Sequence, residues 1–198
     1  MAESLLKNWH ASALVSAVII DGLGAHVAAS NNAEVTGLHK DARELRWTEQ
    51  EKALPLPLPA PGLDPVMDAV VHNSDLLQAL DQETLTVTDL KPGNYALMID
   101  GRTAGTLSAG DLAKGVNLAT METPMLDQAR LVAFDTERKN ALEGQRFELI
   151  RKEPEAENSP TAKAMLQALP AAVDRQRTNA QPRPHQFRLT WVSADAQP

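Results

Sequence analysis

The string with the strongest formal likeness to a catalytic motif surrounds Ser108. It runs Gly105-Thr-Leu-Ser-Ala-Gly, and it holds one residue too many before the serine to be the Gly-x-Ser-x-Gly turn that presents a nucleophile. Ser108 and Asp111 have the spacing of a helix cap, so we predict a short helix that runs to about Lys114 and stops at Gly115. The chain has no Gly-x-Gly-x-x-Gly and no P-loop string, so no nucleotide site is indicated.

The histidines have no spacing that is typical of metal ligands. They are His10, His26, His39, His72 and His185. Because they form no His-x-x-x-His or Glu-x-x-His pattern, a metal site would need ligands from distant segments. Asp68 and His72 are four residues apart on a predicted helix, which is more typical of a surface pair than of a catalytic dyad. The sequence therefore predicts no metal and no cofactor.

Two pairs of acidic residues at alternate positions could supply general acid–base chemistry. Glu49 and Glu51 form one pair, and Glu155 and Glu157 form the other. A general acid needs burial or a charged neighbour to adjust its affinity for the proton. Both pairs stand in polar segments, so we expect exposed side chains without a catalytic role.

Composition excludes several classes of protein. The chain has 198 residues, with 26 acidic and 19 basic side chains and a formal net charge of −7. This balance disfavours a nucleic-acid binder, which needs a basic surface for phosphates. The lack of cysteine excludes disulfides, thiolate metal sites and cysteine nucleophiles. Aromatic residues make up only 4%, so stacking platforms for bases or sugars are scarce.

The N-terminal segment is expected to begin directly in folded sequence, without a leader. The longest apolar run, 13–20, is eight residues long, which is too short to span a bilayer. Residues 2–10 have apolar positions at helical spacing, with no cap before them. These apolar positions are Ala2, Leu5, Leu6 and Trp9.

The remaining pattern predicts an α+β protein. An antiparallel, meander- or sandwich-like β region with one inserted helix precedes two long helices and a terminal strand. Asp64 caps the inserted helix, which runs to Leu80, and alternate prolines make 54–61 an extended segment. The predicted strands are 15–21, 27–38 as one or two strands, 44–48, a three-stranded meander over 84–108, and 186–192. The long helices are predicted at 124–152 and 161–180, and the domains at 1–10, 11–122 and 123–198.

Several separated strings, in order, resemble the C-terminal portion of bacterial SGNH (GDSL-type) hydrolases. They are 15–21, 32–38, 52–57, 85–101, 115–119, 123–125 and 128–129. In that family a flavodoxin-like catalytic domain carries a Gly-Asp-Ser nucleophile block, Gly and Asn oxyanion donors and an Asp-x-x-His block. This chain contains none of these blocks. The resemblance therefore implies no catalytic residue here.

The resemblance implies a truncated or mis-started ester hydrolase that retains its non-catalytic accessory region. Residues 1–10 would be the remnant of the last helix of the missing N-terminal hydrolase domain, which would be the partner. Asn117 and Lys114 are the candidate contacts toward that domain; the favoured alternative is that Gly115 and Asn117 simply end the short helix. Complete relatives are often exported, which implies a periplasmic or extracellular location for the complete protein.

Two other interpretations remain open. One is a stand-alone module that binds a glycan or a protein, although three tryptophans and one tyrosine offer few stacking faces. The other is a remnant whose apolar face on residues 2–10 has lost its partner and favours self-association. None of these interpretations includes a nucleic-acid partner or a membrane span.

Overall fold

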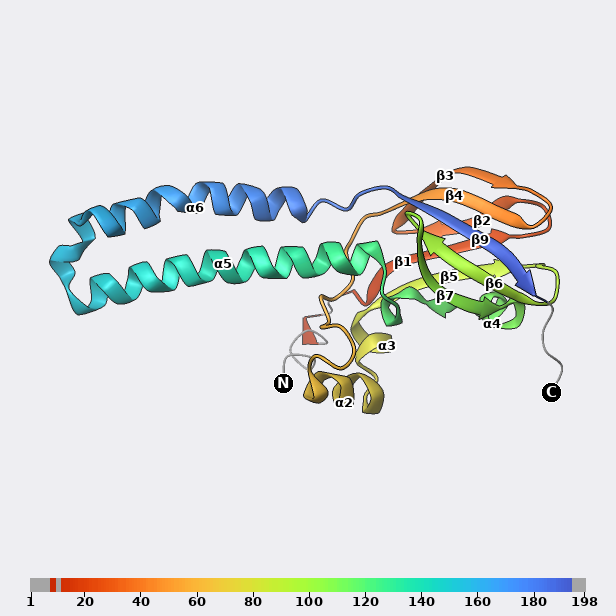
Figure 1. The fold of residues 1–198 in the computed structure, drawn as a ribbon, viewed down its shortest axis with the longest axis horizontal. Coiled ribbons are helices and arrows are strands. Elements are labelled where there is room, and N and C mark those ends of the chain that lie inside the picture. The colour runs from red at the N-terminus through yellow and green to blue at the C-terminus, as the bar shows by residue number, and fades with distance from the viewer. Residues whose placement is uncertain (1–7, 10–11, 194–198) are drawn as a thin grey trace. The chain divides into compact units, whose positions relative to one another are not determined.

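The chain folds as two compact units in the computed structural model, which describes residues 8–9 and 12–193 (Figure 1). Residues 1–127 and 182–198 belong to the first unit, and residues 128–181 form the second. The predicted α+β class is confirmed, with two sheets, two long helices and a terminal strand. The predicted helix 2–10 lies outside the described residues, apart from residues 8 and 9. No helix in the described ranges is both long and apolar enough to cross a bilayer.

Sheet A of the first unit has four strands in the order β2-β1-β5-β8. β1 and β5 run parallel, whereas β1–β2 and β5–β8 are antiparallel pairs. The strands are β1 (Leu14–Asp21), β2 (His26–Asn31), β5 (Gln82–Thr88) and β8 (Val116–Asn117).

Sheet B has five antiparallel strands in the order β3-β4-β9-β6-β7. The predicted terminal strand is confirmed, and it enters the middle of this sheet between β4 and β6. The strands are β3 (Ala33–Lys40), β4 (Glu44–Glu51), β6 (Asn94–Ile99), β7 (Arg102–Ser108) and β9 (His185–Ser193).

The predicted three-stranded meander over 84–108 is wrong in its pairing. β6 and β7 form a hairpin, but β5 pairs with β1 and β8 in the other sheet. The chain therefore crosses from one sheet to the other between β5 and β6. Val87 of β5 and Leu97 of β6 still belong to the same buried cluster, because the two sheets share one core. Alternation shows that a strand has one buried face, but it does not identify the neighbouring strand.

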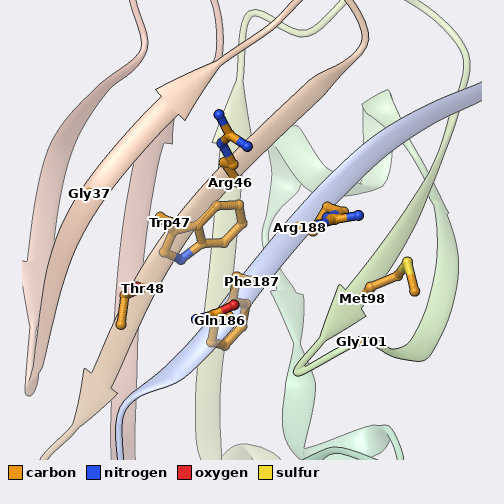
Figure 2. A pocket seen from close by; sticks show the side chains of 9 residues that line it. All are labelled: Gly37, Arg46, Trp47, Thr48, Met98, Gly101, Gln186, Phe187 and Arg188. Atoms are coloured by element: carbon orange, nitrogen blue, oxygen red, sulfur yellow. The ribbon is translucent and has the colours of Figure 1, made fainter.

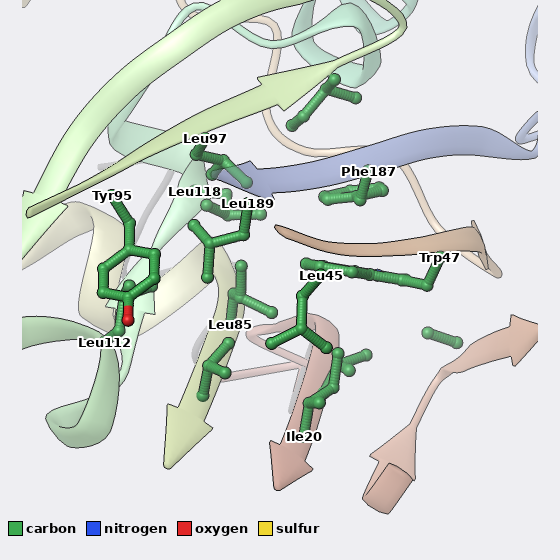
Figure 3. Close-up of a cluster of buried hydrophobic side chains, with 14 of the residues drawn as sticks. Ile20, Leu45, Trp47, Leu85, Tyr95, Leu97, Leu112, Leu118, Phe187 and Leu189 are labelled. Atoms are coloured by element: carbon green, nitrogen blue, oxygen red, sulfur yellow. The ribbon is translucent and has the colours of Figure 1, made fainter. Parts of the chain in front are cut away.

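The inner faces of the two sheets meet in one apolar core (Figure 3). Sheet A contributes Val18, Ile20 and Leu85, and sheet B contributes residues that include Leu97 and Leu189. The rings of Trp47 and Phe187 stack within this core, with centroids 5.2 Å apart. The two sheets therefore form a β-sandwich.

Two of the short helices at the edges of the sandwich begin at the predicted capping residues, but one predicted helix is divided in two. Asp64 accepts hydrogen bonds from the N–H groups of Val66 and Met67, and Ser108 accepts one from Asp111. The single helix predicted at 64–80 is interrupted, because the backbone at Ser74 is extended. The short helices are α2 (Pro65–Asn73), α3 (Leu76–Leu80), α4 (Ala109–Lys114) and the 3-10 turn η1 (Leu118–Thr120).

In the second unit, polar contacts to one buried carboxylate join two long helices. Asp135 is only 3% exposed, and its carboxylate accepts hydrogen bonds from Arg175 at 3.0 Å and from Asn179 at 2.8 Å. These contacts tie the first helix to the second. The elements are α5 (Pro124–Lys152), the 3-10 turn η2 (Pro154–Asn158) and α6 (Pro160–Asn179).

Candidate functional site

Asn117 and Lys114, the two predicted contact residues, have different surroundings. The Asn117 amide oxygen accepts hydrogen bonds from the N–H groups of Glu83 and Ala119, and its amide nitrogen donates to the Asp81 carbonyl at 2.8 Å. This side chain therefore ties β8 to the start of β5. Lys114 is 80% exposed and lies 3.8 Å from Asp111. Their contact with another domain stays a prediction.

A histidine–aspartate pair lies at the start of β9. The Nδ1 atom of His185 is 2.6 Å from a carboxylate oxygen of Asp100, and the other oxygen accepts the N–H of Gln186. Burial disfavours the charge on Asp100, but the Gln186 N–H and the His185 ring outweigh it and hold the pKa of Asp100 below its usual value. The buried Nε2 of His185 has no hydrogen-bond partner. The contact has the geometry of the histidine–aspartate half of a catalytic triad, but among the described residues no hydroxyl group bonds to the other ring nitrogen.

Four carboxyl groups are buried together at one end of the sandwich. The expectation that Glu49 and Glu51 are exposed is wrong, since they are 3% and 4% exposed. Trp47 donates its indole N–H to Glu49 at 3.0 Å, and Ser16 donates its hydroxyl to Glu51 at 2.6 Å. The other two members of this acid cluster are Asp81 and Glu83.

Burial raises the pKa values throughout the acid cluster. It raises the pKa values of Glu49 and Glu51 to about 7 and that of Asp81 to about 6. Burial and the neighbouring carboxylates hold the pKa of Glu83 well above its ordinary value. In the part of the chain that the structure describes, no donor lies within hydrogen-bond reach of the ionised Glu83 carboxylate. When Glu83 is protonated, its carboxyl O–H can donate a hydrogen bond to Glu51. The cluster therefore retains protons near neutral pH.

The strand alternation carries a signal for this burial. β4 places Leu45, Trp47, Glu49 and Glu51 on one face, and the first two of these are core residues. Extending the predicted strand 44–48 by three residues would have placed both glutamates inside. Among the described residues, no group of three or more histidine and acidic side chains is arranged to hold a metal ion.

A pocket of about 510 Å³ opens at the end of the sandwich where β1, β3 and β5 terminate. Three loops surround it: residues 22–23, the turn at 40–44 and residues 89–91. Its volume falls within the range of about 300–1,000 Å³ that is usual for small-molecule sites. The apolar side chains of this loop-end pocket are Leu23, Leu45, Leu90, Leu189, Tyr95 and Trp191.

Charged groups gather around Trp191 in the loop-end pocket. The guanidinium of Arg43 lies 5.6 Å from the ring centroid, and the ammonium of Lys91 lies 4.7 Å from it. Asp89 lines the pocket with φ +54°, a conformation that is strained for a residue with a side chain and is often found near ligands. Apolar walls with a few placed charges suit an amphipathic organic molecule.

Comparison with known proteins finds a likeness of fold. No family model matches the chain, and no curated protein matches it. A solved structure described as BT4096, a gut microbial diltiazem-metabolizing enzyme, matches with a TM-score of 0.74 and 19% identity. The match covers 90% of this chain and 50% of that one, so this chain spans about half the length of the solved protein. At this identity the likeness shows a shared fold.

The assignment to the SGNH hydrolases is wrong by these comparisons. No family model supports it, and the structural neighbour bears a different description. Two of the longest strings behind the resemblance, 15–21 and 85–101, are strands and a Pro-Gly turn, which unrelated β-sheets share because they use the same residues. The truncation inferred from that family loses its support with it.

Proposed function

We propose that this chain is an accessory β-sandwich of an enzyme that transforms drug-sized organic molecules, and that it binds such molecules without transforming them. One observation carries the proposal. The fold likeness covers nearly all of this chain but only half of a diltiazem-metabolizing enzyme, so half of that enzyme has no counterpart here.

The side chains of the first unit support a non-catalytic role. Nucleophilic catalysis needs a hydroxyl or similar group within hydrogen-bond reach of its base. The free nitrogen of His185 has no such partner among the described residues. The hydroxyl of Ser16 is bonded to a buried carboxyl group and not to a histidine.

The loop-end pocket supports the binding part of the proposal. Loops at one end of a rigid sandwich are a common position for binding sites. Trp191 and the surrounding leucines offer apolar contact, and Arg43 and Lys91 add positive charge at the ring.

Diltiazem itself is the probe that tests both parts. The purified chain should form no product, measured by liquid chromatography with mass spectrometry, and should bind diltiazem saturably in calorimetry. Leu23→Ala should weaken binding because it removes apolar surface from the pocket, whereas Leu63→Ala, a similarly exposed leucine that does not line the pocket, should not. Product that increases with chain concentration and disappears in His185→Ala would overturn the non-catalytic role. Equal binding by both leucine variants would remove Leu23 from the site.

A stand-alone binding module is the second candidate, favoured by the loops that form the pocket. Arg43 and Lys91 already approach the Trp191 ring, which leaves less of it for a sugar. A protein ligand is therefore favoured over a glycan. Tryptophan fluorescence with a panel of polysaccharides tests this preference, and saturable quenching by one of them would reverse it.

A further inference from the structure

Two arginines stand directly opposite each other on the outer face of sheet B. Arg46 of β4 and Arg188 of β9 are register partners in the antiparallel pair, so their side chains emerge on the same face (Figure 2). Like charges at such positions repel and destabilise a sheet. The pair therefore needs an explanation other than sheet stability.

The acidic neighbours of these arginines hold them loosely. Arg46 lies 3.8 Å from Asp41, and Arg188 lies 3.6 Å from Glu44. Charge-assisted hydrogen bonds are shorter, at about 2.7–2.9 Å, and each guanidinium has five N–H donors. Arg151, by contrast, reaches Glu148 at 2.8 Å. Both guanidiniums thus keep donors that can engage a ligand.

A hollow of about 200 Å³ is lined by β4 and β9 and by Gly37 of β3 and Met98 of β6. Thr48 and Gln186, the next register pair on the same face, add a hydroxyl and an amide to its lining. Gly37 and Gly101 border it, and a Cβ atom at either position would meet nothing within 4 Å, so the hollow stays open on those sides. No acidic side chain lines it.

We propose that this hollow binds a small oxyanion, a phosphate or a carboxylate group, between Arg46 and Arg188. A guanidinium matches both groups with two parallel hydrogen bonds, and two facing guanidiniums offset their mutual repulsion when an anion lies between them. The hollow is smaller than the usual pocket for a whole organic molecule, so it suits a compact charged group. This site is separate from the loop-end pocket and does not depend on the proposed function.

Titration with inorganic phosphate tests the site, and acetate in a parallel titration reports on carboxylates. NMR spectra of the full chain should show saturable shifts of the Arg46 and Arg188 side-chain Nε–H signals, with potassium chloride keeping ionic strength constant. Saturation by either anion supports the site, and the tighter anion identifies the preferred group. The proposal would be overturned if neither anion gave saturable shifts, or if potassium chloride alone gave the same shifts.

Three variants separate the site from general charge effects. Arg46→Gln and Arg188→Gln should each weaken anion binding about tenfold, because each removes charged hydrogen bonds. Arg151→Gln, which removes the same charge from α5, should bind as the unchanged protein does. Circular dichroism confirms that each variant folds. Unchanged affinity in both Arg46→Gln and Arg188→Gln would also overturn the proposal.

Discussion

Replacing Glu49 with glutamine should stabilise the first unit at alkaline pH and reduce its pH dependence. The Glu49 carboxyl is 3% exposed, and burial raises its pKa from 4.5 to about 7. This rise corresponds to roughly 3 kcal/mol of stability lost when Glu49 ionises in the folded protein, at about 1.4 kcal/mol per pKa unit. Glutamine never ionises, and its side-chain oxygen can still accept the Trp47 indole N–H.

The direction of the effect follows from which state binds more protons. Between pH 4.5 and about 7 the folded Glu49 keeps a proton that the unfolded chain has released. The free energy of unfolding therefore falls as pH rises through this window and levels off above it. Glu51 and Asp81, whose pKa values are raised to about 7 and about 6, act in the same direction.

Urea unfolding at pH 5 and pH 8, followed by tryptophan fluorescence, measures the effect in the first unit alone, because residues 128–181 contain no tryptophan. The loss of stability from pH 5 to pH 8 should be smaller in Glu49→Gln than in the unchanged protein by about 2.5 kcal/mol, because part of the effect lies below pH 5. Glu34→Gln, on the exposed side of β3, serves as the control and should leave the loss unchanged. An identical loss in Glu49→Gln would refute the reasoning, whereas a uniform packing defect would lower both values without changing their difference.

Three further substitutions test the packing. Asn117→Ala should destabilise the first unit by about 2 kcal/mol, since it removes the hydrogen bonds that tie β8 to β5; an unchanged urea midpoint would contradict this. Gly93→Ala should destabilise it by at least about 2 kcal/mol, because the added Cβ would lie 2.3 Å from the Ser193 carbonyl oxygen, and native-like thermal unfolding would argue against that contact. Asp135→Ala should cost the second unit about 2 kcal/mol, because it removes the hydrogen bonds that Arg175 and Asn179 donate to a charged carboxylate; an unchanged melting temperature of the helical circular dichroism signal would count against it.

Local features of the sequence were enough to predict most of the elements. Asp64 and Ser108 cap helices as their spacing indicates, because a cap depends only on residues two or three positions away. The long helices and the terminal strand likewise follow from patterns that repeat over short distances. The break at Ser74 escaped prediction because the apolar stripe continues on both sides of it.

The candidate sites depend on contacts that local patterns do not encode. His185 and Asp100 are 85 residues apart in the chain, and the loop-end pocket collects three separate loops. The Arg46 and Arg188 pair exists only because β9 enters sheet B beside β4. No spacing within the sequence could have joined these residues.

The sequence by itself determined where helices and strands form, because hydrophobic periodicity, caps and turns act over a few residues. The tertiary structure alone decided which strands are neighbours, since many pairings bury the same apolar faces. That choice moved β5 into sheet A and placed Asp81 and Glu83 beside Glu49 and Glu51. Burial then raised the pKa values of Glu49 and Glu51 to about 7. The polar residues beside them in the sequence gave no indication of this change.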